Sequence, residues 1–409
     1  MNIPLSAPDI GEREVDYVNS VMRSNQLSMG PWLERFEKRF ASYVGTRHAI
    51  AVNSGTSGLH LCVRALGIGA NDEVITSSFS FVASVSCFLY EGALPVLVDI
   101  DPNTLNLDPA AVRNFLKEHC SRAADGTLVD RRSGRVVKAV MPVHIFGLPC
   151  PMGELMQIAR EYGLPVIEDA CEALGAEYDG QRAGTFGDAG VFAFYPNKQM
   201  TTGEGGMITT NDPQIAELCR SMRNQGRDTD GAWLRHVRLG YNYRLSELHA
   251  ALGLAQLERI DEILASRAEV ARLYSRELAG LTQLQLLEND SRSKRSWFVY
   301  VVRFRSVSPD SLRDRVREVL REKGIASQIY FTPIHQQPFF QKCLPDSIPA
   351  LPYTDQAADE CLALPFHTRL TETEIKFVRD AIKEALEPPK QESQTSEPAL
   401  IVSTRLLET

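Results

Sequence analysis

The sequence predicts an α/β protein whose large domain has three layers, with a mostly parallel sheet between two layers of helices. Short apolar runs alternate with longer amphipathic segments through the first half of the chain, as in a parallel sheet with helical crossovers. These runs are almost continuously apolar, which strands require when helices cover both faces of their sheet. A chain of 409 residues also has room for two domains.

We expect a large domain over residues 1–255 and a smaller α+β domain over residues 256–387. Residues 388–409 begin with a polar stretch rich in Ser, Glu and Pro, so we expect a disordered tail there. The large domain should open with helices in residues 11–44, where apolar residues recur at helical spacing. The alternating pattern then predicts strands at 48–52, 73–81, 94–100, 138–147 and 164–170, and helices at 58–66, 82–90, 108–119 and 151–162.

Turn signals interrupt this alternation twice. Residues 120–137 form an insertion in which Ser133-Gly134 predicts a small hairpin. Asp179-Gly180 predicts a second hairpin over residues 176–184. A long helix that starts after Ser246 should link the two domains, and the remaining predicted elements are a strand at 297–304 and helices at 309–323 and 370–386.

Composition excludes several classes of partner. The formal net charge of −8 gives no electrostatic reason to expect nucleic acid, and it argues against adhesion to anionic membranes. The first residues lack the apolar core of a signal peptide, and no apolar run is as long as a membrane span. The eight cysteines contain no CxxC pair, and no HExxH pattern indicates a metal. We expect a cytoplasmic protein with reduced thiols and no metal.

An aspartate and a lysine give the strongest chemical signal. Asp169 ends an apolar strand, so its carboxylate should lie in the crevice beyond the strand ends. Lys198 follows another β-rich run, in FYPNKQMTTGEGG. Pyridoxal phosphate requires a lysine that binds it covalently and an acidic residue that keeps its ring nitrogen protonated. A helix-capping aspartate and a solvated lysine explain this spacing at least as well.

A phosphate site is indicated just after the first predicted strand. Gly55, Thr56 and Ser57 open a helix, and the backbone N–H groups at a helix N-terminus bind phosphate. An ordinary N-cap built from small residues is an equally good explanation. The segment is neither a Walker loop nor a dinucleotide-binding fingerprint, because the required glycines and lysine are missing.

Three further side chains are candidates on weaker grounds. Phe81 ends a predicted strand, where an aromatic ring either stacks on a flat cofactor or packs in the core. His144 and His335 are candidate bases, although a histidine alone in a loop is usually not catalytic. The glycines that follow Lys198 are interpreted as a turn between strands.

Taken together, six motifs in order resemble the DegT/DnrJ/EryC1/StrS family of sugar aminotransferases, which have the aspartate aminotransferase fold (type I) and use pyridoxal phosphate. The resemblance runs from about residue 3 to residue 386. The motifs are FEKRFASYVGTRHAIAVNSGTSGLHL, NDEVITSSFSFVAS, PVHIFG, PVIEDACEALGAEYDG, FYPNKQMTTGEGGMITTND and GYNYRLSELHAALGLAQLE.

The resemblance implies roles residue by residue. Lys198 is the implied Schiff-base lysine, and Asp169 is the implied partner of the pyridine nitrogen; these two are the catalytic residues. Glu172 stands where the family usually has Gln, near the phenolic oxygen of the cofactor. The cofactor-binding residues that the resemblance implies are Gly55, Thr56, Ser57, Phe81, Asp169, Glu172, Lys198 and Asn242.

The resemblance also implies a homodimer with shared active sites, because Asn242 matches a residue that reaches the phosphate in the other subunit. Two departures stand out. Ala193 occupies a position where the family often has a serine that contacts the phosphate, and the insertion at 120–137 is longer than the usual connection.

The implied reaction is ping-pong transamination, with glutamate as the amino donor and a nucleotide-linked keto-sugar as the acceptor. Alternatives are a keto-cyclitol acceptor, or a regulatory protein on a degenerate aminotransferase fold. A dehydratase on the same fold usually has histidine in place of the lysine, so Lys198 argues against that chemistry.

Overall fold

The computed structural model describes residues 1–228, 234–287, 289, 291–305, 312–344 and 348–387. The predicted tail at 388–409 and the start of the helix predicted at 309–323 lie outside these residues. No helix among the described residues is long and apolar enough to cross a membrane.

The centre of the larger part is a sheet made of two hydrogen-bonded groups of strands, with the orders β1-β11-β10-β7 and β3-β2-β6-β5-β4. Parallel bridges from Val140 to Val166 and from Val143 to Asp169 join the two groups. β2 runs parallel to β3 and β6, and β10 runs parallel to β7, whereas β11 is antiparallel to both of its neighbours. The prediction of a mostly parallel sheet is therefore confirmed. The strands are β1 (His48–Val52), β2 (Asp72–Ser77), β3 (Leu94–Val98), β6 (Val136–Val140), β7 (Ile167–Asp169), β10 (Ala189–Ala193) and β11 (Gly206–Thr210).

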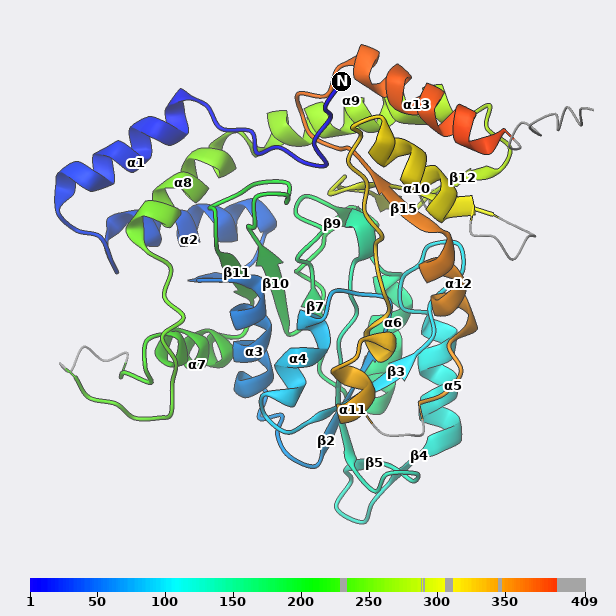
Figure 1. The fold of residues 1–409 in the computed structure, drawn as a ribbon. Helices are drawn as coiled ribbons and strands as arrows, with labels where there is room; N and C mark the ends of the chain where they lie inside the picture. Colours follow the sequence, from blue (N-terminus) through cyan, green and yellow to red (C-terminus); the bar gives the residue numbers. More distant parts are fainter. Residues whose placement is uncertain (229–233, 288, 290, 306–311, 345–347, 388–409) are drawn as a thin grey trace, which may run out of the picture.

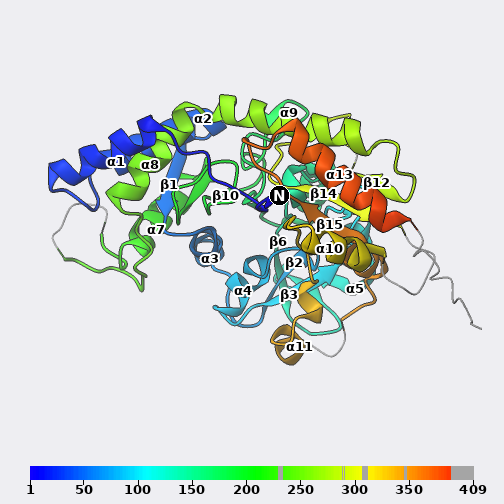
Figure 2. The same ribbon diagram turned by 45° about the horizontal axis from the view of Figure 1, so that its top comes forward.

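Helices cover both faces of this sheet, as the apolar strands require (Figures 1 and 2). Ile50 and Val52 of β1 pack in one cluster with α3 and α7, while Ala49 and Ala51 pack in another with α2 and α8. Successive side chains of a strand point to opposite faces, so β1 contacts both helical layers. The helices of this part are α1 (Glu12–Ser24), α2 (Pro31–Val44), α3 (Gly55–Ala65), α4 (Ala83–Leu89), α5 (Pro109–His119), α6 (Met152–Tyr162), α7 (Pro213–Arg223) and α8 (Glu247–Glu258).

The hairpin predicted in the insertion is confirmed, and a second one precedes it. β4 (Cys120–Arg122) and β5 (Leu128–Asp130) are antiparallel, and β5 turns through Gly134, at φ 72°, into β6. The hairpin predicted at Asp179-Gly180 is also present, between β8 (Glu177–Tyr178) and β9 (Gln181–Arg182). Both turn residues have positive φ, 48° and 76°, which a tight two-residue hairpin requires.

Several predicted elements have different limits. The strands predicted at 138–147, 164–170 and 297–304 are Val136–Val140, Ile167–Asp169 and Tyr300–Phe304. The strand predicted at 73–81 ends at Ser77. The single helix predicted after Ser246 is two helices, α8 and α9 (Ile260–Leu278), that meet at Arg259. The guanidinium of Arg259 binds the carboxylates of Asp9 and Glu14, each at 2.7 Å, so this non-helical residue ties the helix pair to the N-terminal segment.

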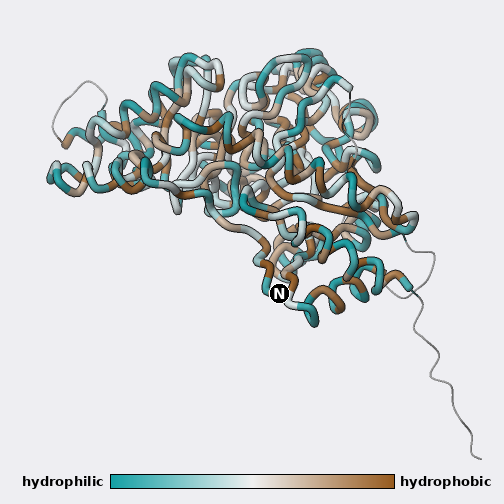
Figure 3. The backbone as a smooth tube through the Cα atoms, turned by 90° about the horizontal axis from the view of Figure 1, so that it is seen from above, coloured by the Kyte–Doolittle hydropathy of each residue, from teal (hydrophilic) through white to brown (hydrophobic). Residues whose placement is uncertain are grey.

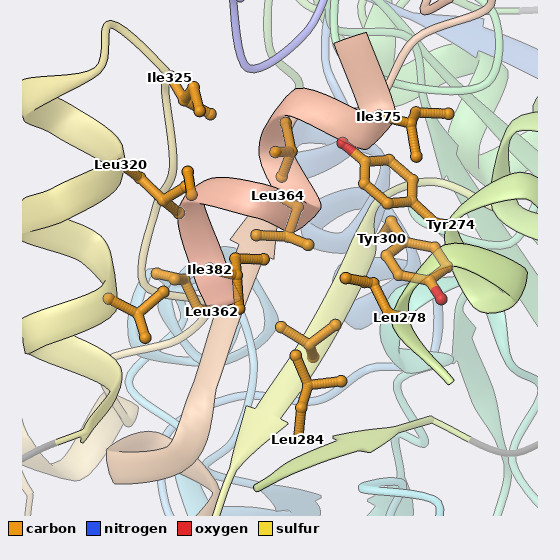
Figure 4. Packing of buried hydrophobic residues seen from close by; sticks show 14 of the residues in the cluster. Tyr274, Leu278, Leu284, Tyr300, Leu320, Ile325, Leu362, Leu364, Ile375 and Ile382 are labelled. Atoms are coloured by element: carbon orange, nitrogen blue, oxygen red, sulfur yellow. The ribbon is translucent and has the colours of Figure 1, made fainter. Parts of the chain in front are cut away.

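The C-terminal part is built around an antiparallel sheet with the order β12-β14-β15. Figure 4 shows its core, in which Tyr274 of α9, Leu320 of α10 and Ile382 of α13 pack near Leu362 of β15. Ile3 belongs to the same cluster, so the start of the chain packs against the C-terminal part. The domain boundary at residue 255 stays a prediction. In Figure 3, hydrophilic and hydrophobic residues alternate along these outer helices. The remaining elements are β12 (Leu284–Leu286), β13 (Ser293–Lys294), β14 (Tyr300–Phe304), α10 (Leu312–Glu322), η1 (Ile145–Gly147), η2 (Ile334–Gln336), α11 (Phe340–Cys343), α12 (Pro352–Glu360), β15 (Cys361–Leu364) and α13 (Glu372–Leu386).

Candidate active site

The carboxyl ends of neighbouring strands bring the predicted residues to one edge of the sheet. β7 ends at Asp169, and β10, its parallel neighbour, ends at Ala193 shortly before Lys198. β1 is antiparallel to β11 and β11 to β10, so β1 also ends on this side. Ligands of open α/β sheets bind in the crevice beyond these strand ends.

Asp169 has a fixed, buried carboxylate. Its side chain is among the buried polar groups, and its Oδ2 accepts a hydrogen bond from the Ser84 hydroxyl at 2.7 Å. Its Oδ1 accepts a hydrogen bond from the backbone N–H of Cys171 at 3.1 Å. A turn and no helix follows β7, so the helix-capping interpretation of Asp169 is wrong.

Lys198 is not a solvated surface lysine. Its side chain is 14% exposed, and its Nζ lies 3.6 Å from Oε1 of Glu172. The same Nζ lies 3.9 Å from the centre of the Phe298 ring. An ammonium group gains favourable electrostatic energy both from a carboxylate and from the face of an aromatic ring.

Glu172 is a buried acid between this lysine and the chain after β6. Its Oε2 accepts a hydrogen bond from the backbone N–H of Phe146 at 2.9 Å. Burial raises the pKa of Glu172 above its ordinary value, while the charge of Lys198 and the hydrogen bond from Phe146 oppose that rise. The position that resembles the family's glutamine is thus in contact with Lys198.

The predicted phosphate loop packs directly on the ends of β7 and β10. α3 begins at Gly55, earlier than predicted, because the Ser54 hydroxyl caps the helix by accepting from the N–H of Ser57 at 3.1 Å. A Cβ on Gly55 would lie 2.8 Å from the Cβ of Ala193 and 2.9 Å from the Sγ of Cys171. Only glycine allows this approach, so Gly55, Thr56 and Ser57 lie beside the ends of β7 and β10.

The glycines after Lys198 have two separate structural roles. Gly203 has φ 80° and forms the predicted turn between β10 and β11. Gly206 begins β11, where a Cβ would lie 2.7 Å from the carbonyl oxygen of Ser54. The absence of a side chain at Gly206 therefore allows the start of the phosphate loop to pack against β11. The interpretation of these glycines as a simple turn did not include this contact.

Phe81 is 60% exposed, so its interpretation as a core residue is wrong. It lies two residues before the start of α4, and its carbonyl accepts from the N–H of Ser84, the residue that binds Asp169. Sequence reasoning missed Ser84 and Phe298. Neither has a local signal, because one is a serine in an apolar helix and the other lies far along the chain, just before β14.

Neither candidate histidine is free to act as a base at this site. His144 is fully buried; its Nδ1 accepts from the N–H of Cys150, and its Nε2 bonds to Glu168, both at 3.1 Å. His335 bonds through Nδ1 to the hydroxyl of Ser78 at 2.7 Å and pairs through Nε2 with Asp355 at 3.2 Å. Both imidazoles connect segments of the fold.

Asn242 lies apart from the lysine, on a segment that runs beside the start of the phosphate loop. The carbonyl of the next residue, Tyr243, accepts from the N–H of Asn53 at 3.0 Å. The Asn242 side chain is exposed. No group of three or more metal-binding side chains occurs in the part of the chain that the structure describes.

Comparisons with known proteins agree with this geometry. The model of the DegT/DnrJ/EryC1/StrS aminotransferase family matches residues 8–383. The GDP-perosamine synthase of Caulobacter vibrioides is 40% identical over 386 residues, which are 94% of this chain and 98% of that protein. The GDP-perosamine synthase of Vibrio cholerae is 34% identical over 382 residues, 93% of this chain and 98% of that protein.

Solved structures show the same fold. DesV of S. venezuelae superposes with a TM-score of 0.83 at 32% identity, covering 95% of this chain and 99% of that one. A DegT/DnrJ/EryC1/StrS aminotransferase of Brucella abortus has a TM-score of 0.81 at 29% identity, covering 91% and 95%. The chain therefore belongs to the DegT/DnrJ/EryC1/StrS family of sugar aminotransferases and is a pyridoxal-phosphate-dependent aminotransferase of fold type I.

Proposed function

We propose that the protein transfers an amino group from glutamate to a keto-sugar linked to a nucleotide, by ping-pong transamination through Lys198. The observation that carries the proposal is the position of the Lys198 amine, 3.6 Å from Glu172, at the sheet edge where the buried carboxylate of Asp169 also lies. A shielded lysine beside a fixed acid is what this class of cofactor requires.

The residues at the sheet edge fit pyridoxal phosphate part by part. The close packing of Gly55 on Ala193 and Cys171 sets the amide groups of the α3 N-terminus next to the strand that ends at Asp169. These amides suit the phosphate, and the carboxylate of Asp169 suits the protonated ring nitrogen. Phe81 is exposed at the end of the chain segment that leads from β2 to α4, where it can cover the ring. Ala193 contributes no hydroxyl to the phosphate.

The chain's own groups supply binding and proton transfer. When bound, pyridoxal phosphate supplies the electron sink for breaking a bond at the donor's α-carbon. Asp169 would pair with the protonated ring nitrogen, and its hydrogen bonds with Ser84 and Cys171 hold the carboxylate in place. The Lys198 amine would take the proton from the donor's α-carbon as a general base and, in the second half-reaction, give a proton as a general acid to the acceptor carbon that receives the amino group. Glu172 holds that amine at the site while it is charged.

The acceptor is inferred from the relatives. The two proteins named GDP-perosamine synthase match this chain over nearly their whole length, which supports an acceptor that is a keto-sugar carried by a nucleotide. A keto-cyclitol carries no nucleotide. Binding of the free nucleotide by the protein would therefore favour the keto-sugar as the acceptor. The homodimer with shared sites, to which Asn242 contributes across subunits, is part of the same proposal.

Labelled amino groups test the proposal directly. The protein is mixed with ¹⁵N-glutamate and with a set of nucleotide keto-sugars and keto-cyclitols, and the products are analysed by mass spectrometry. We expect the label on a nucleotide sugar, with no transfer by Lys198→Ala. Lys294→Ala is the control, because Lys294 is 70% exposed and pairs with Glu177 on the surface. Label on a cyclitol would identify the cyclitol, and not the nucleotide sugar, as the acceptor. Transfer by the Lys198→Ala protein would refute the role of the lysine.

A further inference from the structure

A half-buried carboxylate, that of Glu91, joins three segments next to the phosphate loop. Glu91 follows α4, and it bonds to two residues of α3, His60 and Arg64, and to Tyr241 in the segment between α7 and α8. α3 and α4 lie side by side in Figures 1 and 2. The residues of this Glu91 cluster are His60, Arg64, Glu91, Tyr241 and Tyr243.

Glu91 accepts three hydrogen bonds within the cluster. Its Oε1 accepts from His60 Nε2 at 2.7 Å and from the Tyr241 hydroxyl at 3.0 Å, and its Oε2 accepts from Arg64 Nη1 at 2.8 Å. Burial alone would raise the pKa of Glu91, but the hydrogen bonds from His60, Tyr241 and Arg64 hold it below its ordinary value. The carboxylate is therefore ionised at neutral pH, and bonds to an ionised acceptor are stronger than neutral ones.

The two tyrosines form one face of an extended segment. Their rings are stacked, with centroids 4.9 Å apart and planes at 10°, and the Tyr243 hydroxyl bonds to Nδ1 of His60 at 3.1 Å. Alternate residues of an extended chain point to opposite sides. Because Tyr241 and Tyr243 face the cluster, Asn242 between them faces away, in agreement with its exposed side chain.

The backbone of this segment is fixed on both sides. The N–H of Tyr241 bonds to the carbonyl of Met222 at 2.7 Å, and the carbonyl of Tyr243 accepts from Asn53 at 3.0 Å. Asn53 immediately precedes Ser54, the cap of α3. The cluster thus connects the body of α3, whose first turn is the phosphate loop, with the segment that carries Asn242.

We propose that Glu91 and Tyr241 are positioning residues that hold Asn242 in the orientation in which it binds the cofactor phosphate of the partner subunit. This inference rests on the proposed function, which assigns the phosphate contact to Asn242. Neither Glu91 nor Tyr241 is among the residues expected to bind the cofactor. Their effect passes through the orientation of one residue, so it should be specific to the phosphate.

Two ligands separate this role from a general structural one. Cofactor-free protein is titrated by fluorescence with pyridoxal phosphate and, separately, with pyridoxal, which lacks the phosphate. Tyr241→Phe keeps the ring stack and removes one hydroxyl, whereas Glu91→Gln removes the charge. Both substitutions should lower the affinity for pyridoxal phosphate roughly five- to tenfold, which corresponds to the loss of about one hydrogen bond. The affinity for pyridoxal should change about twofold at most. Glu161→Gln is the control, because Glu161 pairs with Arg113 on the surface.

Asn242→Ala and its double variant with Tyr241→Phe complete the test. The double variant should bind pyridoxal phosphate no more weakly than Asn242→Ala does, because both changes remove the same contact. Losses that add fully, or equal losses for the two ligands, would overturn the inference. If Asn242→Ala leaves the affinity for pyridoxal phosphate unchanged, the assignment in the proposed function fails first. If only the Glu91 and Tyr241 variants have no effect, the positioning role alone fails.

Discussion

Asp169 illustrates how one buried side chain can be prepared for a charged partner. Its carboxylate has two donors, the Ser84 hydroxyl and the Cys171 N–H, and both hold its oxygens in place. An asparagine of the same shape can keep contacts of this kind but carries no charge. The contribution of the charge can therefore be separated from that of the shape.

We expect Asp169→Asn to slow transamination severely while the cofactor stays bound, because an amide cannot keep the ring nitrogen protonated by charge pairing. Steady-state rates and the cofactor content after gel filtration measure the two effects. Ser84→Ala removes only one supporting bond of Asp169 and should cost far less. If the rate of Asp169→Asn stays within a few-fold of the parent, Asp169 is not the partner of the ring nitrogen.

Glu172 gives a prediction about pH. Its folded-state pKa is raised above the ordinary value of 4.5, mainly by burial, so the folded protein keeps a proton that the unfolded chain releases. The contribution of Glu172 to the free energy of unfolding is therefore fully present below pH 4.5. It is lost as the pH rises through the raised folded-state pKa.

Glu172→Gln should remove this dependence. We compare urea unfolding of the cofactor-free parent and variant from pH 4 to pH 8, and we expect the variant to gain in relative stability as the pH rises. Because the rest of the chain is the same, the difference between the two proteins isolates Glu172. A constant difference over this range would mean that Glu172 does not titrate in the folded state.

At the scale of elements, the phosphate loop depends on the absence of one side chain. Gly55 begins α3 within 3 Å, measured from a hypothetical Cβ, of both Ala193 and Cys171. Interiors packed this closely do not accept an added methyl group without displacement, at a cost of about 1–3 kcal/mol.

Gly55→Ala should therefore lower both the free energy of unfolding and the affinity for pyridoxal phosphate. Gly153→Ala is a matched control in the first turn of α6, because the nearest atom to its added Cβ is Nη2 of Arg292, at an ordinary 3.4 Å. Alanine is also the better helix former by about 1 kcal/mol. Equal effects of the two substitutions in urea unfolding and cofactor titration would contradict the close packing of the loop.

The elements that the sequence predicted well are those with local signals. Alternating apolar runs predicted the strands that end at Asp169 and precede Lys198, and Asp179-Gly180 predicted a hairpin that the positive φ angles confirm. The break at Arg259 was missed, because its cause is a long-range ion pair with Glu14 that has no signal within the helix. Phe298 was missed as a contact of Lys198 for the same reason.

For the whole molecule, the central question is whether the active site is shared between subunits. The order of the six motifs predicted the family, and the alternation of apolar and amphipathic segments predicted the large sheet. The proposed placement of Asn242 across a dimer cannot follow from one chain, because its side chain is exposed and the proposed contact involves a second subunit.

Mixed dimers test this arrangement. Lys198→Ala and Asn242→Asp homodimers should both be inactive, the second because a carboxylate repels the phosphate. If the two proteins are unfolded and refolded together, about half of the dimers are mixed, and one of the two sites in each mixed dimer is intact, so roughly a quarter of the parental activity should return. No recovery, with subunit exchange confirmed by a mass tag, would reject shared sites.

The most direct test of the account concerns the position of the cofactor itself. The protein is loaded with pyridoxal phosphate, reduced with sodium borohydride so that the cofactor stays attached to the lysine that holds it, and digested for peptide mass analysis. The account predicts that the modification lies on the peptide that contains Lys198, and that the Lys198→Ala protein carries none. Attachment to any other lysine, or specific attachment in the Lys198→Ala protein, would contradict it.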